Sequence, residues 1–262
     1  MNLHALFFQE NGSERRRGWV HCFNWVLALL LISAVFTFSF HQLTYHWNWP
    51  SVTKYRAKFF QGWCITILLS LTSLVASTVI GLIFAFARRS RILVLRYLAR
   101  IYVELIWGTP LLVQILIFFY VVADAFHVSN RYLVGGLVLS VFSAAYIAEI
   151  IRAGIESVGK SQLESARAVG FTQVQTYRYV IFPQAIRQML PALAGQFALL
   201  IKNSSLLSII AISELTLNAE EVNSYTYSTL ESYIPLAVGY LVLTIPISIW
   251  SRWLESRNRY ET

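Results

Sequence analysis

The stretch SQLESARAVGFTQVQTYRYVIFPQAIRQMLP, from Ser161 to Pro191, decides how the chain is interpreted. It is polar, and an apolar stretch of membrane-spanning length lies on either side of it. A connection this long inside a compact membrane protein is functional or disordered, and its pattern favours helices. Gly170 occupies the place where a first short helix needs a left-handed residue at its end, and Pro183 is placed to stop a second one. We expect two short helices that form an L-shaped docking element on one face of the membrane.

Two capping patterns support this interpretation. Ser161 stands three residues before Glu164, and Thr172 stands three before Gln175. In a capping box the hydroxyl and the second side chain satisfy backbone N–H groups that a helix start leaves without partners. Each pair therefore predicts the start of one short helix.

Composition places the chain in a bilayer. Mean hydropathy is +0.56, with 56% hydrophobic and 13% charged residues, which is unlike an ordinary soluble domain. A bilayer-crossing helix needs ~20 apolar residues, and long runs almost free of charge predict six spans: 20–41, 62–87, 98–123, 133–152, 192–212 and 232–252. The expected fold is all-α and polytopic, with five core helices and an extra N-terminal anchor helix. We expect residues 1–57 to hold the tail, anchor and outer loop, and 58–255 to form the main domain.

Basic residues in the loops predict the orientation of these spans. The side that holds both termini and the Ser161–Pro191 loop carries sixteen Lys and Arg, whereas the other side carries four: Lys54, Arg56, Lys58 and Arg131. Both termini are therefore expected in the cytoplasm, and the net charge of +8 is a topology signal that requires no nucleic-acid partner. The first span, preceded by Arg15–Arg17, is too long for a cleaved signal peptide and lacks a cleavage site. Aromatic residues at its outer end, Tyr45, Trp47 and Trp49, are typical of an interface belt against membrane lipid.

Sites for enzymatic chemistry are missing from the sequence. It has no Walker motif, glycine-rich phosphate loop, metal-ligand cluster or nucleophile elbow. Cys22 and Cys64 lie in or beside apolar runs, so neither a disulfide nor a metal site is expected. We therefore expect a chain that holds no cofactor and cannot hydrolyse ATP by itself.

The polar loop resembles the EAA loop of ABC importer permeases, which docks on a cytoplasmic ATPase. That pattern is Glu-Ala-Ala, then Gly, then an apolar-x-Pro sequence, and Glu164-Ser165-Ala166, Gly170 and Ile181-Phe182-Pro183 match it. The resemblance implies that residues 153–191 form the coupling loop. It assigns contact with the ATPase to Glu164, Ser165, Ala166, Gly170 and Pro183.

Further motifs across residues 58–255 are similar to permeases of polar-amino-acid importers, the histidine/glutamine type. The stretch Glu104–Gln114 matches the family's Glu-x-x-Arg-Gly-Thr-Pro-Leu-Leu-x-Gln, except that Trp107 replaces the arginine. The break at Gly108-Thr109-Pro110 is either a plain proline kink or part of the transport pathway. The segment Ala145–Ile155 also matches, and within it Glu149 and Arg152 are spaced to pair on one helix face.

Polar residues inside a span point to a substrate pocket. Lys202-Asn203-Ser204-Ser205-Leu206 stands where the family has Lys-Asp-Thr-Ser-Leu, and ionisable groups inside a span suggest function. Lys202 snorkels, pairs structurally or meets substrate, while Asn203 weakens an arginine- or lysine-specific interpretation. We expect substrate to bind Thr109, Gln114, Lys202, Asn203, Ser204 and Ser205. Further on, the acidic stretch Glu214–Glu231 predicts a short amphipathic helix that presents acid to the periplasm, as a solvated face or as a landing surface for a binding protein.

The resemblance implies the permease subunit of an ATP-driven importer of polar amino acids, with a type I importer fold, in the bacterial inner membrane. Its expected partners are two ABC ATPase chains, a periplasmic substrate-binding protein, and a second permease subunit, identical or similar. Alternatives are a permease for another small solute (an opine, a sulfur amino acid or a quaternary amine) and a secondary transporter. The intramembrane coupling-ion groups that a secondary transporter needs are scarce outside the Lys202 region.

Overall fold

A computed structural model describes residues 18–42 and 45–258 of the 262-residue chain. The described part contains helices and no strand. Arg15–Arg17, which support the predicted topology, lie outside the described residues. The chain divides into two units, Met1–Trp47 and Asn48–Thr262, and each is considered by itself. In the first unit, helix α2 (Gly18–His41) is apolar along its length, and no residue of its span Cys22–His41 is buried.

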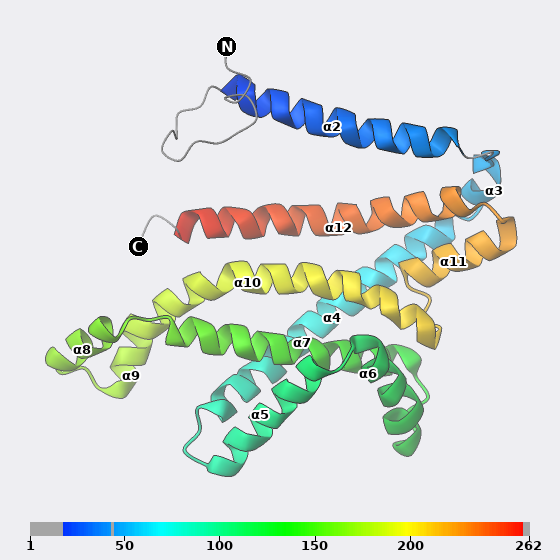
Figure 1. The fold of residues 1–262 in the computed structure, drawn as a ribbon. Helices are drawn as coiled ribbons and strands as arrows, with labels where there is room; N and C mark the ends of the chain where they lie inside the picture. The colour runs from blue at the N-terminus through cyan, green and yellow to red at the C-terminus, as the bar shows by residue number, and fades with distance from the viewer. Residues whose placement is uncertain (1–17, 43–44, 259–262) are drawn as a thin grey trace. The chain divides into compact units, whose positions relative to one another are not determined.

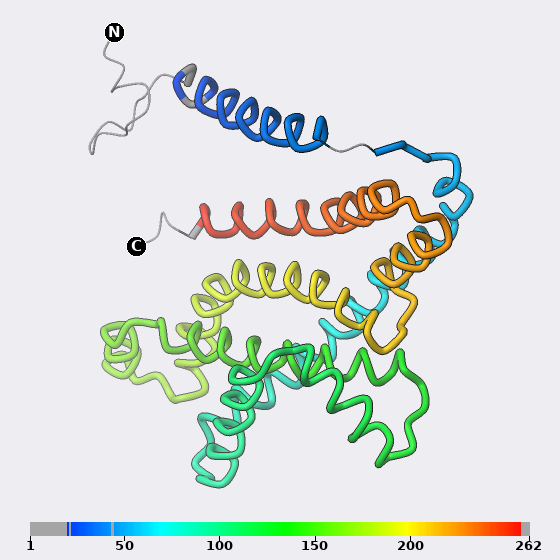
Figure 2. The backbone as a smooth tube through the Cα atoms, turned by 45° about the vertical axis from the view of Figure 1, so that its right-hand side comes forward, coloured from blue at the N-terminus to red at the C-terminus, as the bar shows by residue number. Residues whose placement is uncertain are grey.

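The second unit is a bundle of long helices joined by short ones (Figures 1 and 2). In chain order its elements are α3 (Trp49–Thr53), α4 (Arg56–Arg88), α5 (Leu93–Gly108), α6 (Leu111–Ile117), η1 (Phe118–Ala123), α7 (Arg131–Glu156), α8 (Lys160–Ala168), α9 (Gln173–Thr176), η2 (Tyr177–Ile181), α10 (Phe182–Asn203), η3 (Ser204–Ile210), α11 (Leu215–Thr226) and α12 (Thr229–Asn258). Figure 1 places α8 and α9 at one end of this bundle and α11 at the other.

Membrane-length helices agree with the predicted spans. Among the described residues five helical stretches are long and apolar enough to cross a bilayer: Cys22–His41, Arg56–Arg88, Arg131–Glu156, Gln173–Ile210 and Thr229–Arg257. A sixth crossing is made only if α5 and α6–η1 count as one span, because the chain bends by 110° between them. The predicted span 98–123 is therefore a broken helix.

Small side chains let α4 and α7 approach closely. The buried face of α4 is formed by Gly62, Thr66, Leu69, Ser70, Ser73, Ser77, Gly81 and Ala85, mostly the small residue types that allow close contact between membrane helices. The Ser73 hydroxyl donates to the Gly136 carbonyl at 3.1 Å. A Cβ on Gly81 would lie 2.7 Å from Ile147 Cγ2. From the first contact to the second, the residue numbers increase in both helices, so α4 and α7 run parallel.

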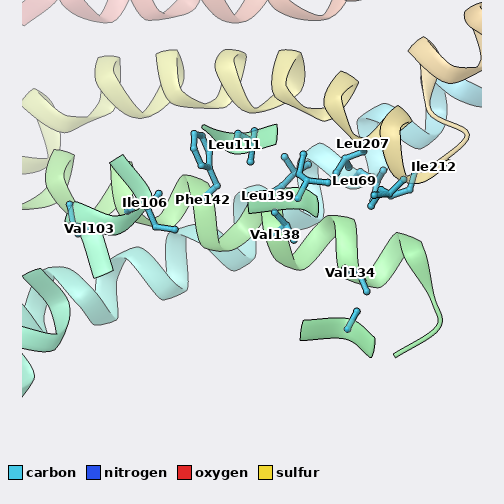
Figure 3. Close-up of a cluster of buried hydrophobic side chains, with 14 residues drawn as sticks. Leu69, Val103, Ile106, Leu111, Val134, Val138, Leu139, Phe142, Leu207 and Ile212 are labelled. Atoms are coloured by element: carbon cyan, nitrogen blue, oxygen red, sulfur yellow. The ribbon is translucent and has the colours of Figure 1, made fainter. Parts of the chain in front are cut away.

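Apolar side chains fill two clusters around this helix pair. The larger one joins α4, α5, α6, α7 and η3, and Figure 3 shows Leu69, Leu139, Leu207 and Ile212 meeting within it. The smaller one lies nearer the α8–α9 end and joins the last turns of α7, through Ile151 and Ile155, to Ile181, Ala185 and Met189. A Cβ on Gly154 would overlap the Met189 side chain. The segment after α7 is therefore packed firmly back onto that helix.

Candidate functional site

The polar segment after α7 folds as two short helices at a sharp turn, as predicted. α8 ends at Ala168, and Gly170 adopts φ +83°, a conformation that glycine adopts without steric cost. At the start of α9 the Thr172 hydroxyl accepts from the Gln175 N–H while the Gln175 side chain accepts from the Thr172 N–H at 2.8 Å. This capping box is confirmed.

The other two local predictions in this segment are wrong. α8 begins one residue before Ser161, with Gly159 at its N-cap and no side-chain cap. The Gly159 carbonyl accepts from the Gln162 and Leu163 N–H groups, so Ser161 lies inside the first turn and Glu164 does not form the expected box.

Pro183 does not end the second helix. It lies in the first turn of α10, where its missing N–H is tolerated. The preceding turn, Tyr177–Ile181, is π-helical, and such a turn absorbs the break in the hydrogen-bond ladder. The helix therefore continues from the polar segment after α7 directly into the membrane span.

Several large apolar side chains of this segment are exposed. Ala166 is buried, whereas Glu164, Ser165, Gly170 and Pro183 are exposed. The large exposed apolar side chains are Val169, Phe171, Val174, Tyr179, Phe182 and Ile186, and Val169 and Val174 are each 75% exposed. Exposed apolar patches rimmed by polar residues mark protein contacts.

The polar groups at the helix break hold one another. Gln114, which is buried, donates its amide N–H groups to the Ile106 carbonyl at 3.0 Å and to the Thr109 carbonyl and hydroxyl at 3.1 and 2.8 Å. The Thr109 hydroxyl donates to the Leu105 carbonyl at 2.8 Å. These contacts satisfy backbone groups that Gly108-Thr109-Pro110 would otherwise leave without partners. Trp107 lies half-exposed beside the break, and the centroid of its ring is 5.6 Å from that of Tyr146.

Among the predicted pocket residues of α10 and η3, the two serines are bonded to the backbone, whereas the side chains of Lys202 and Asn203 are not bonded to the described residues. Ser204 is fully buried and its hydroxyl donates to the Ile201 carbonyl, while the Ser205 hydroxyl donates to the Lys202 carbonyl, both at 2.7 Å. Lys202 is exposed, Asn203 is partly exposed, and neither side chain has a hydrogen bond or ion pair with the described residues. α6 packs against η3, so the helix break and the Lys202–Ser205 segment belong to one region of the bundle.

A buried glutamate, missed by the sequence analysis, lies just after this segment. Glu214 and Glu231 are both fully buried, so the expectation that they present acid to solvent is wrong. Glu214 caps α11 by accepting from the Thr216 and Leu217 N–H groups, and it accepts from the Tyr240 hydroxyl at 3.0 Å. Burial raises the pKa of Glu214 to about 7. Glutamate is not among the preferred N-cap residues, so its position before α11 gave no capping signal in the sequence.

The ion pair predicted at the α8–α9 end of α7 is confirmed and extended. Arg152 donates to Glu149, and Arg88 of α4 binds the same carboxylate at 2.5 Å. Sequence spacing predicts contacts within one helix only, so it could not reveal the bond from α4.

Comparisons with known proteins agree with this architecture. Residues 77–260 match the family model described as binding-protein-dependent transport system inner membrane component. The chain belongs to this family. It is 40% identical to a probable glutamine ABC transporter permease protein, GlnM, of Bacillus subtilis (strain 168), over 76% of this chain and 92% of that one. It is 32% identical to the glutamine transport system permease protein GlnP of Escherichia coli (strain K12), over 83% and 99%.

A solved structure also resembles the chain. The crystal structure of an amino acid ABC transporter with histidines is 37% identical, with a TM-score of 0.76, over 81% of this chain and all of that one. The chain is thus a multi-pass membrane permease of the ABC transporter class with the type I importer fold, and its family is a transport family without a catalytic role.

Proposed function

We propose that this chain is the membrane-spanning subunit of an ATP-driven importer of polar amino acids, with glutamine and histidine the first candidates. The relatives that support this substrate class are two glutamine permeases and an amino acid transporter solved with histidines. ATP hydrolysis belongs to a partner ATPase, a periplasmic binding protein delivers substrate, and a second permease subunit, identical or similar, completes the pathway in the bacterial inner membrane.

The observation that carries the proposal is the exposed Lys202-Asn203 pair inside a membrane span. Ile210, at the end of the span Gln173–Ile210, lies eight positions beyond Lys202, a rise of about 14 Å against a hydrocarbon thickness of ~30 Å. A cation at that depth is costly without a partner, and no described residue supplies one. A substrate carboxylate satisfies Lys202, and Asn203 offers a donor and an acceptor to the rest of a zwitterion.

The remaining predicted pocket residues have supporting roles in this proposal. Thr109 and Gln114 fix the broken helix, and Ser204 and Ser205 fix the turn into η3 by hydrogen bonds to backbone carbonyls. The residues thus hold the backbone on which Lys202 and Asn203 meet the substrate.

In this proposal residues 153–191 couple the chain to the ATPase and are called the coupling segment. Its exposed apolar side chains and its rigid connection to α7 and α10 support docking on an ATPase through the turn at Gly170. In this proposal the main domain is 58–255, and residues 1–57 supply the anchor helix and the loop after it.

The test is uptake by proteoliposomes that contain the chain assembled with its ATPase and supplied with its binding protein. We expect ATP-dependent uptake of labelled glutamine or histidine. Asn203→Ala should raise the substrate concentration that gives half-maximal stimulation of ATP hydrolysis roughly 10- to 150-fold, the loss of affinity expected for one hydrogen bond to a charged group, with assembly intact. Gly195→Ala, where an added Cβ meets nothing within 4 Å, is the matched control in the same helix. Uptake that follows an ion gradient without ATP would overturn the proposal.

An opine importer is the second candidate. The chain is 35% identical to the octopine transport system permease protein OccM of Rhizobium radiobacter and 38% identical to the nopaline permease NocM of Agrobacterium fabrum (strain C58 / ATCC 33970). The same uptake assay should therefore include octopine for the opines, methionine for the sulfur amino acids and choline for the quaternary amines. Uptake of one of these in preference to glutamine would identify that class as the substrate.

A further inference from the structure

A charged network joins α4, α7 and the coupling segment at one end of the bundle. Glu149 is its centre: one carboxylate oxygen accepts from Arg88 at 2.5 Å, and the other accepts from Arg152. The side chains of Arg88 and Glu149 are only 23% and 20% exposed. The last turn of α4 is thereby bonded to the last turns of α7.

The network continues from α7 to the coupling segment. Arg152 also binds Glu156, and Glu156 lies 4.0 Å from Arg89. Arg89, the residue directly after α4, donates to the Tyr177 hydroxyl at 3.2 Å. Tyr177 begins the π-helical turn that links the coupling segment to α10, and its ring packs against the smaller apolar cluster.

The geometry of this network favours positioning over stabilisation. Surface ion pairs contribute little to stability, and Glu156 is half-exposed. Arginine, however, presents a planar fork with fixed directions, so its bonds fix angles between elements. The smaller apolar cluster already attaches the coupling segment to α7 and includes Ala85 of α4, whereas Arg88 and Arg89 provide the polar bonds that hold the end of α4 against Glu149 and Tyr177.

We propose that the Arg88–Glu149–Arg152–Glu156–Arg89–Tyr177 network positions the coupling segment on α4 and transmits its displacement to that helix. The inference rests on the proposed function, since it assumes that residues 153–191 meet an ATPase. In it, apolar packing moves α7, α10 and the body of α4 together, and the charged bonds fix the direction of the end of α4 relative to the coupling segment. Loss of Glu149 or of the Tyr177 hydroxyl loosens the end of α4 while the packed helix pair α4–α7 remains intact.

The first experiment measures position in the full-length chain alone, in lipid nanodiscs. Spin labels at Ile83→Cys on α4 and Val174→Cys on α9, with Cys22 and Cys64 changed to serine, report the distance between α4 and the coupling segment; the two labelled side chains are 61% and 75% exposed. We expect a narrow distance distribution that broadens in Glu149→Gln and in Tyr177→Phe. Arg100→Gln, which removes the exposed Arg100–Glu104 pair within α5, is the matched control and should leave it unchanged.

A double-mutant cycle separates positioning from general damage. The broadening caused by Tyr177→Phe should disappear in an Arg89→Gln background, because the bond is already lost there. Tyr177→Phe keeps the packed ring, so it remains informative if Glu149→Gln reduces folding. Unchanged distributions in both variants, or additive effects in the cycle, would overturn the inference.

The second experiment measures transmission in the complex with the ATPase and binding protein. We expect Glu149→Gln and Tyr177→Phe to raise the ATP hydrolysed per glutamine imported by about fivefold or more, with the ATPase retained. A wild-type ratio in both variants overturns transmission. If no amino acid stimulates ATP hydrolysis by the wild-type complex, the proposed function is overturned instead. The spin-label distances still test the positioning role on their own.

Discussion

At the scale of single residues, two positions have backbone or burial constraints that make sharp predictions. Gly170 holds φ +83° at the turn between α8 and α9, and a Cβ there would touch nothing. The requirement is therefore purely conformational. Left-handed backbone costs a residue with a Cβ roughly 1–2 kcal/mol, and asparagine adopts it more readily than alanine.

We expect Gly170→Val to lower transport and ATPase retention, and Gly170→Asn to restore most of both. Membrane insertion should be normal in each variant, because the turn lies outside the spans. Pull-down of the ATPase with tagged chain measures retention. Equal behaviour of the valine and asparagine variants would show that the positive φ is not what the coupling segment requires.

Glu214 makes the second residue-scale prediction. Its folded pKa of about 7 lies above the ordinary value of 4.5, so the folded state keeps a proton that the unfolded state has lost between these pH values. The free energy of unfolding should therefore fall as pH rises through this window, by at most roughly 3 kcal/mol. In detergent, the thermal midpoint of the wild type should drop between about pH 5 and pH 8.

Glu214→Gln should flatten that dependence, because its amide does not titrate and its oxygen still accepts from the cap N–H groups. Glu220→Gln, a partly exposed carboxylate in the same helix, is the control and should retain the wild-type slope. Identical slopes in Glu214→Gln and wild type would assign the pH dependence to another group.

At the scale of elements, the capping box of α9 is the clearest local determinant in the coupling segment. Thr172→Ala removes the hydroxyl that accepts from the Gln175 N–H, a loss of about 1 kcal/mol for an N-cap. Because α9 has only four residues, loss of its N-cap should unfold the helix and disorder the exposed apolar side chains around it. We expect faster hydrogen exchange over residues 172–177 and weaker ATPase binding. Ser161→Ala, at the cap that does not form, should change neither.

Elements that depend on local chemistry were predictable, and those that depend on tertiary contacts were not. Gly170 and the Thr172–Gln175 box follow from residues a few positions apart. The start of α8 at Lys160 and the continuation of the helix past Pro183 do not follow from local sequence. Packing of α7 against Met189 and Ile181 sets where the chain turns. The 110° bend after Gly108 shows the same limit: the sequence marks the break, but Gln114 and the larger cluster fix its angle.

Site residues divide in the same way. Lys202 and Asn203 could be selected because polar groups inside an apolar span stand out in the sequence. The bonds of Arg88 to Glu149 and of Tyr240 to Glu214 join residues 61 and 26 positions apart. Neither pair shares a helix, so no periodicity reveals either of them. Trp107 contacts Tyr146, and nothing in the structure explains why it replaces the arginine of the family pattern.

At the scale of the whole molecule, the sixteen-to-four distribution of Lys and Arg makes a prediction about orientation. α8 and α9 lie at one end of the second unit and α11 at the other (Figure 1), so one labelling experiment can test which end is cytoplasmic. Basic loops are retained in the cytoplasm, and the coupling segment carries Arg167, Arg178 and Arg187. The coupling end should therefore face the ATPase compartment, and α11 should face the periplasm.

Single cysteines at Gln173 and Asn48, in a background with Cys22 and Cys64 changed to serine, separate the two orientations. An impermeant maleimide applied to intact cells should label position 48 and spare position 173, and permeabilised cells should be labelled at both. Gln173 is exposed, so failure to label it from outside reflects the membrane and not burial. Labelling of 173 in intact cells would place the coupling segment away from ATP, and the importer mechanism could not then operate through it.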